Sequence, residues 1–469
     1  MQFQSNVLQQ IVNSYLDKEY EEEIEECHEF MELLLDDDNN GILDDDEIDT
    51  EARKKIRWKH LRLEWSYHVS QLLHEGYFKD EYRMSYETWM KLYVALSPKL
   101  RRKKNVRTRN NPVTVQLIMG LGLRWLTGTD MNSCRHIFKM SRTEAYRCAS
   151  KFMYAVLTTK SLQIRLPKSR NQWTKVKDGF RNKSTRGVMY GCCGAIDGIF
   201  IRTMRPRYSD VKNVRAYYSG HYEHYGINCQ GMCDAHLRFL YFGVVAPGST
   251  NDNIAYMKAS DLREEIEKLE IGEFVVGDAA YTVTEHLLIP FTGSQRDVEE
   301  QDAFNFYLSQ LCIRIEMAFG LLVKKFSILQ TILKHRIGTV SRIIMCCAQL
   351  HNFVINNDGS DIEDNMGDGT IDVNNLQPLN GERLNAQRYS PGGNMVYQPT
   401  MIENGFNKIV GTSNTRDEFV QFLKNNGFKR PAYNLLRNSR LRQLTREDIE
   451  GNRRRYKDVE TSTEFYHPM

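Results

Sequence analysis

Several features that would place this 469-residue chain in a common class are missing from its sequence. It has no run of about 18 consecutive apolar residues, so we expect no membrane-spanning helix. Its N-terminus, MQFQSNVLQQIVNSYL, lacks a basic segment followed by an apolar one, which argues against a secretory signal. Ten cysteines are too few for a disulfide scaffold. The adjacent pairs Cys192/Cys193 and Cys346/Cys347 are typical of buried free thiols in a reducing compartment.

Common catalytic motifs are missing as well. The chain has neither a Gly-x₄-Gly-Lys-Ser/Thr loop nor a Gly-x-Gly-x-x-Gly turn, which argues against a nucleotide-driven enzyme. Ser249 has no Gly-x-Ser-x-Gly setting, so we do not expect a serine hydrolase. No repeat with a period of 20–50 residues indicates a solenoid.

Charge is present in quantity but is unevenly distributed. Residues 17–49 hold 17 Asp and Glu against one Lys, whereas residues 51–190 hold 31 Lys and Arg against nine acids. A basic region of this size beside an acidic arm indicates a polyanionic partner. The densest run, KLRRKKNVRTR at 99–109, predicts contact with DNA phosphates or a nuclear import signal. The alternative is a solvated linker between helices.

Composition and periodicity divide the chain into five regions. The middle of the chain alternates strand-like and helical segments, which predicts an α/β fold with helices packed on a mixed sheet. The expected strands are 187–204, 228–234, 239–245 and 274–278, and the expected helices are 251–269 and 303–329. The five regions are an acidic, disordered arm (1–50), a basic helical region (51–187), the α/β domain (188–357), a disordered linker (358–415) and a basic tail with a helical pattern (416–469).

The basic region contains three helix-sized segments, at 113–126, 131–138 and 141–156. Ser141 followed by Glu144 predicts the start of the third segment. Three short helices with tight turns suit a helix-turn-helix DNA-binding unit, and a small bundle with an ordinary basic surface is the alternative. The residues expected to contact DNA are Arg101, Arg102, Lys103, Lys104, Arg107, Arg142 and Arg147.

Three carboxylates stand in apolar settings. Asp197 lies inside the strand GAIDGIFI, Asp278 ends the strand FVVGD, and Glu316 lies in the helical run RIEMAFGLL. A charge among apolar residues is costly unless it is paired or binds a metal, and Gly194 and Gly198 leave room for a ligand. Carboxylates that converge could hold two Mg²⁺ ions for phosphodiester chemistry. A lone Asp after a strand is also common as a helix cap or turn residue.

Four blocks in fixed order carry a family resemblance. They are GAIDGIFI with Asp197, APGSTND with Asp252, GDAAYTVTEHLLIPF with Asp278, and IRIEMAFGLLVKKF with Glu316. This series resembles the PIF/Harbinger-type transposases of the DDE superfamily, which also includes domesticated nuclear proteins. Further similar blocks at 80–98, 121–147 and 346–355 extend the resemblance over about residues 80–355.

The resemblance implies a function and a site. Asp197, Asp278 and Glu316 match the catalytic triad, and Asp252 matches a further metal-binding acid. The implied fold is RNase H-like, and the implied reaction is Mg²⁺- or Mn²⁺-dependent cleavage and joining of double-stranded DNA at transposon ends, in the nucleus. A Myb-like DNA-binding partner protein and a homo-oligomer are also implied. The alternative is a domesticated protein that binds DNA or a Myb-like partner without cleaving.

The chain departs from the family pattern beside three of the acids. Ile199 and Phe200 stand where Thr-His is usual, Asn251 where His is usual, and Met317 where Arg is usual. None of these departures removes a carboxylate, but they keep the non-cleaving alternative open.

Two weaker metal-binding patterns remain. Residues 36–47, DDDNNGILDDDE, fit a calcium-binding EF-hand loop, but the match lies in an acid-rich tract where chance matches are common. His221, His224, Cys229, Cys233 and His236 raise the question of zinc. On a strand, however, Cys229 and Cys233 would be about 13 Å apart, so we expect ordinary sheet residues there.

Overall fold

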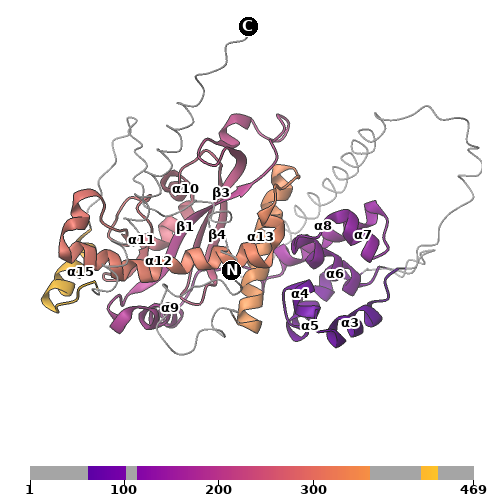
Figure 1. Cartoon of the computed structure of the whole chain (residues 1–469), viewed down its shortest axis with the longest axis horizontal. Helices are drawn as coiled ribbons and strands as arrows, with labels where there is room; N and C mark the ends of the chain where they lie inside the picture. Colours follow the sequence, from indigo (N-terminus) through magenta and orange to yellow (C-terminus); the bar gives the residue numbers. More distant parts are fainter. Residues whose placement is uncertain (1–61, 102–112, 360–412, 431–469) are drawn as a thin grey trace, which may run out of the picture.

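The computed structural model describes residues 62–101, 113–359 and 413–430 (Figure 1). The arm at 1–50, with its candidate calcium loop at 36–47, lies outside these residues, as do most of the predicted linker and tail. The described part combines a helical region with a mixed α/β domain. The helical region consists of α3 (Trp65–His74), α4 (Phe78–Tyr82), α5 (Tyr86–Leu100), α6 (Val115–Leu126), α7 (Met131–Ile137) and α8 (Arg142–Thr158).

The three helices predicted in the basic region are confirmed as α6, α7 and α8. Each begins at a side chain that accepts a backbone hydrogen bond: Thr114, Asp130 and Ser141. Helix α6 packs closely on α8 because Gly122 has no side chain, which leaves room for the ring of Phe152. The helices therefore form a compact bundle around α6.

The α/β domain is built on the mixed sheet that the sequence predicts. Along the sheet the order is β4, β3, β1, β5, β6, and the short β2 pairs with the start of β3. Strands β1, β3 and β4 are antiparallel neighbours, whereas β5 and β6 run parallel to β1. The two-residue strands β2 and β6 were not predicted, because they are too short to show alternation. The strands are β1 (Cys192–Arg202), β2 (Tyr218–Ser219), β3 (His224–Cys233), β4 (Phe239–Pro247), β5 (Phe274–Val276) and β6 (Leu287–Leu288).

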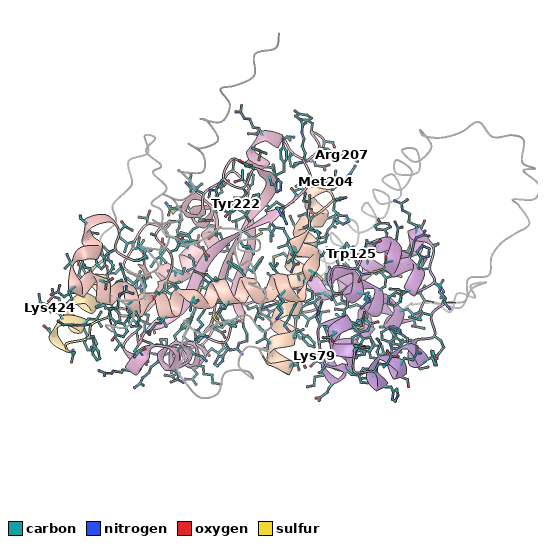
Figure 2. The ribbon with its side chains drawn as sticks, viewed as in Figure 1. Lys79, Trp125, Met204, Arg207, Tyr222 and Lys424 are labelled. Carbon is teal, nitrogen blue, oxygen red and sulfur yellow. The ribbon has the colours of Figure 1, made fainter. Side chains whose placement is uncertain are left out.

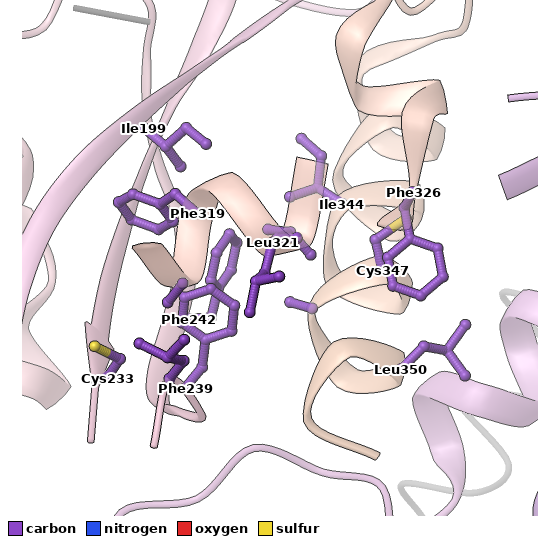
Figure 3. Packing of buried hydrophobic residues seen from close by; sticks show 14 of the residues in the cluster. Ile199, Cys233, Phe239, Phe242, Phe319, Leu321, Phe326, Ile344, Cys347 and Leu350 are labelled. Carbon is purple, nitrogen blue, oxygen red and sulfur yellow. The ribbon is translucent and has the colours of Figure 1, made fainter. Parts of the chain in front are cut away.

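Helices pack on the sheet, and the longest of them, α12, crosses it (Figure 1). By length and composition alone helix α12 could cross a membrane, but 56% of its apolar window is buried inside the protein. Figure 3 shows Phe319 of α12 beside Phe239 and Phe242 of β4. Helix α12 is therefore a core helix. The helices of the domain are α9 (Arg170–Lys183), α10 (Asp252–Lys258), α11 (Ser260–Glu267), α12 (Glu299–Lys325), α13 (Ile337–Asp358) and α15 (Asn414–Asn425).

Short 3₁₀ turns join several of these elements. They are η1 (Thr185–Gly187), η2 (Val214–Tyr217), η3 (Gly293–Asp297) and η4 (Ser327–Gln330).

Helix α13 carries the Leu-His-Asn block and holds two parts of the fold together. His351 donates from Nε2 to the carbonyl oxygen of Leu237 at 2.8 Å, and Asn352 bonds both the N–H and the carbonyl of Phe239 at 2.7 Å. At the end of the helix, Asp358 accepts hydrogen bonds from the backbone and hydroxyl of Ser85, the residue before α5. The block thus fixes the β3–β4 turn and joins the sheet to the helical bundle.

Two helices lie where the region boundaries did not place them. Helix α9, predicted as part of the basic helical region, packs on β1 and buries Val176 and Phe180. Helix α15, in the predicted tail, packs on α12 and sets Phe419 against Phe274 of β5, with ring centroids 5.1 Å apart. Both helices have few apolar residues, so their sequence alone does not show which surface they cover.

Candidate active site

The register of two parallel strands brings the first two acids together. Ala195 of β1 pairs with Val276 of β5. Asp197 and Asp278 each stand two residues further along, and strand side chains return to the same face every two residues. The Asp197 carboxylate is held by the N–H of Gly198 at 2.7 Å, and that of Asp278 by the N–H of Ala280 at 2.9 Å.

Helix α12 brings the third acid to the same end of the sheet. The Cys312 thiol lies 3.5 Å from the carbonyl oxygen of Gly277, the residue before Asp278. Glu316 follows Cys312 by four residues and therefore lies on the same side of the helix. Its neighbours Ile315 and Phe319 are buried as predicted, whereas Glu316 itself is exposed.

The fourth acid, Asp252, opens α10 and rests against β1. Asn251 caps this helix by accepting from the N–H of Ile254 at 2.8 Å. The absence of a side chain at Gly198 leaves room for the Asp252 carboxylate, because a Cβ at Gly198 would lie only 2.1 Å from Asp252 Oδ1. The room that Gly198 leaves is therefore taken by a carboxylate rather than by a ligand. The room at Gly194 is taken in the same way by Met232.

A chain of buried polar side chains that the sequence analysis missed holds Asp252 in position. Asn228 donates to Asp252 Oδ1 at 2.9 Å, Gln230 donates to Asn228 Oδ1 at 3.1 Å, and the Tyr281 hydroxyl donates to Gln230 Oε1 at 2.8 Å. Asn228 and Gln230 are buried, two residues apart on β3. Polar residues at alternate positions of an otherwise apolar strand were the signal available in the sequence.

These four carboxylates, Asp197, Asp252, Asp278 and Glu316, are named here the acidic site, and the pKa of each is raised. Burial raises the pKa of Asp197 well above its usual value, and the charges of Asp278, Asp252 and Glu316 raise it further. Burial raises the pKa of Asp278 to about 6 against the opposing Ala280 hydrogen bond, and the charge of Asp252 adds to the increase.

The pKa values of the other two acids are raised as well. Burial raises the pKa of Asp252 although hydrogen bonds from Asn228 and Gln230 oppose it. Loss of hydration and the charge of Asp278 raise the pKa of Glu316. Like charges held together in a partly buried place favour either shared protons or a bound cation.

The donor set suits a hard divalent cation. All four side chains offer carboxylate oxygens, the ligands that Mg²⁺ and Mn²⁺ prefer. Across residues 62–101, 113–359 and 413–430, no group of three His, Cys, Asp or Glu side chains is arranged so that it could hold a metal ion. The fit therefore rests on the chemistry and the mutual charge of the cluster. The candidate zinc residues Cys229 and Cys233 are buried free thiols on β3.

The predicted DNA-contacting residues are only partly described. Arg101 is exposed at the end of α5. Arg142 begins α8 and is partly buried, and Arg147 pairs with Glu144 at 3.0 Å. Contact of these three with DNA stays a prediction. Arg102, Lys103, Lys104 and Arg107 lie outside the described residues.

The residues that depart from the family pattern have packing and capping roles here. Ile199 is buried in the sheet, and Phe200 stacks on Tyr222 with ring centroids 4.3 Å apart. Asn251 caps α10, and Met317 packs against the core. None of the four displaces an acid.

Comparison with known proteins agrees with the motifs. Residues 196–352 match the model of the DDE superfamily endonuclease. The chain is also 23% identical over 289 residues to the protein named ALP1-like from Arabidopsis thaliana, covering 58% of this chain and 68% of that protein. No solved structure matches the chain. Residues 196–352 are thus similar to the DDE superfamily endonuclease domain, and these matches support the resemblance of the motifs to the Harbinger-type DDE nucleases.

Proposed function

We propose that this protein is a divalent-metal-dependent endonuclease with an RNase H-like domain that cleaves and joins DNA at transposon ends. The observation that carries the proposal is the acidic site. Four carboxylates from two strands and two helices meet in a partly buried place where their charges oppose one another. Such an arrangement is unfavourable by itself and becomes favourable with a cation.

The residues of the acidic site have different proposed roles. Asp197 and Asp278 would hold Mg²⁺ or Mn²⁺, with Glu316 completing the site and Asp252 supporting it. The bound metal would supply an activated nucleophile and stabilise the leaving oxygen. Asn228 and Gln230 keep the Asp252 carboxylate oriented through their hydrogen bonds, and Ala280 does the same for Asp278. Their role is to hold the acids in one geometry before DNA arrives.

The remaining features of the proposal rest on composition and on the family resemblance. The basic helical region would bind double-stranded DNA through phosphate contacts. A nuclear location, a Myb-like partner and self-association are proposed on the same grounds. The non-cleaving, domesticated protein is the competing function, and cleavage itself decides between the two.

The experiment measures Mg²⁺- or Mn²⁺-dependent cleavage of DNA that carries the element's own ends, with the Myb-like partner supplied. We expect wild type to cleave and Asp278→Asn and Glu316→Gln to lose at least about a hundredfold in rate, because both remove a metal ligand. Glu264→Gln, which changes an exposed carboxylate on α11, is the matched control and should cleave normally. DNA binding without cleavage by wild type would favour the domesticated binding protein.

A further inference from the structure

A second polar feature lies where β1 leaves the sheet. A cavity of about 400 Å³ opens between the segment after β1 and the strand pair β2–β3. This volume falls in the range of roughly 300–1,000 Å³ that is typical of small-molecule sites. Three basic and three aromatic side chains line it and are named here the basic pocket: Arg205, Lys212, Arg215, Tyr208, Tyr218 and Tyr225.

The basic pocket presents aromatic faces to solvent beside positive charge. Tyr208 is 75% exposed and Tyr218 is 41% exposed. The Tyr218 and Tyr225 rings meet edge to face, 5.2 Å between centroids, and Arg205 donates to the Tyr208 hydroxyl at 3.1 Å. Flat rings beside positive charge suit a ligand with flat, stackable groups and negative charge.

Nearby acids do not cancel this charge. Residues 203–218 contain four basic residues and one acid, Asp210. Asp210 faces Arg336, with oxygen and nitrogen 3.9 Å apart, and is absent from the lining of the cavity. The lining of the basic pocket therefore carries three basic side chains and no acidic one.

A backbone hydrogen bond links the segment that carries the basic pocket to the segment that leads to Asp252. The N–H of Ser249 donates to the carbonyl oxygen of Ala216 at 3.0 Å, and Asp252 follows Ser249 by three residues. Figure 2 shows Met204 and Arg207, from the segment that forms the basic pocket, at the end of the sheet beyond Tyr222.

We propose that the basic pocket binds an unpaired nucleotide of a DNA strand that leads to the acidic site. Paired bases hide their faces in the duplex, whereas an unpaired base exposes a face that stacks on tyrosine, and the neighbouring cations contact its phosphates. The inference rests on the proposed nuclease function, since it supplies DNA as the ligand. It adds that DNA with a frayed or single-stranded end is the preferred substrate.

The test measures DNA binding by the full chain in EDTA, so that cleavage plays no part. The two probes are a blunt duplex and the same duplex with a short single-stranded extension that carries 2-aminopurine. We expect the extension to tighten binding about five- to tenfold and the 2-aminopurine fluorescence to fall as the base stacks. Tyr208→Ala and Tyr218→Ala should remove this advantage, whereas Tyr218→Phe should keep it.

Control variants separate this site from the general surface. Tyr67→Ala changes a tyrosine of α3 that is 63% exposed, and Lys268→Ala changes a surface lysine that pairs with Glu265. Neither should alter the preference. Because the Tyr208 side chain is largely exposed, its removal leaves the fold intact, which thermal unfolding checks.

Three results would overturn the proposal. Equal affinity for the two probes, with cleavage by wild type retained, would remove the basic pocket as a nucleotide site and leave the nuclease function standing. Loss of affinity for both probes in Arg215→Ala, with no effect of the tyrosine variants, would mean contact with duplex phosphates only. Absence of any DNA binding or cleavage would remove both the basic pocket and the nuclease function.

Discussion

The acidic site and the basic pocket are neighbours built in opposite ways. The acids lie on strands and on helices that begin or pass at the end of the sheet, and buried hydrogen bonds fix Asp252. The pocket side chains are mostly exposed and come from a segment with little regular structure. The acids proposed to bind the metal, which tolerate little displacement, thus lie on rigid elements. The side chains proposed to bind DNA, which must adapt to it, lie mostly on a loop.

The largest effect that tests this contrast is expected from Gly198→Ala. A Cβ at this position would lie 2.1 Å from Asp252 Oδ1 and 2.9 Å from Gln230 Nε2, so the carboxylate must shift. Displacement of a catalytic group by about 1 Å can lower a rate about a hundredfold, and we expect a loss of about ten- to a hundredfold in metal-dependent cleavage.

Gly220→Ala is the matched control, because a Cβ there meets nothing within 4 Å. Neither glycine has a left-handed backbone, so only the steric contact differs between the two variants. Single-turnover cleavage rates measure the difference. Equal rates for the two variants would show that Asp252 is as adaptable as the pocket residues, and the contrast would fail.

The second effect concerns stability in the absence of metal. Asp278 has a pKa of about 6 in the folded protein against 3.8 ordinarily, because it is buried beside other acids. The folded state therefore binds the proton more tightly. The resulting stability is fully present below about pH 3.8 and is lost as pH rises through about 6.

Asp278→Asn removes the ionisation while keeping an oxygen for the Ala280 hydrogen bond. In EDTA at pH 8 we expect its free energy of unfolding to exceed that of wild type by about 1–3 kcal/mol, and the difference to vanish near pH 4. Urea unfolding at both pH values measures this, with Glu264→Gln as the surface control. A less stable Asn variant at pH 8 would mean that the acids do not repel one another.

The difference between the acidic site and the basic pocket also explains which features could be predicted from the sequence. Asp197, Asp278 and Glu316 stand in apolar settings, but only the family resemblance selected them from the other acids. The mixed sheet was predicted from the order of strand-like and helical segments. In the structure the charges of the other three acids raise the pKa of Asp197, and the assignment of the four acids as the catalytic site stays a prediction. Strand register, which sets Asp197 beside Asp278, depends on long-range pairing that no local pattern shows.

The basic pocket was not recognisable in the same way. Arg205, Lys212 and Arg215 are ordinary surface residues in the sequence, and only the folding of residues 203–218 against Tyr225 makes them a lining. The packing partners of helices α9 and α15 could not be predicted for a related reason, since their few apolar residues do not identify the surface they cover. A carboxylate in an apolar segment can be noticed in the local sequence. The residues that line a surface pocket become apparent only in the folded chain.

The smallest effect is expected from Arg215→Ala. It concerns the salt dependence of DNA binding by the basic pocket. If Arg215 contacts one phosphate of a single strand, its loss should reduce the slope of log affinity against log salt concentration by about 0.7. Affinity for the extended duplex at low salt should fall a few-fold, while Lys268→Ala leaves both quantities unchanged. Asp278→Asn in EDTA should not reduce the slope, because an acid contacts no phosphate. A reduction of equal size in Lys268→Ala would mean that the whole basic surface, rather than the basic pocket, receives the strand.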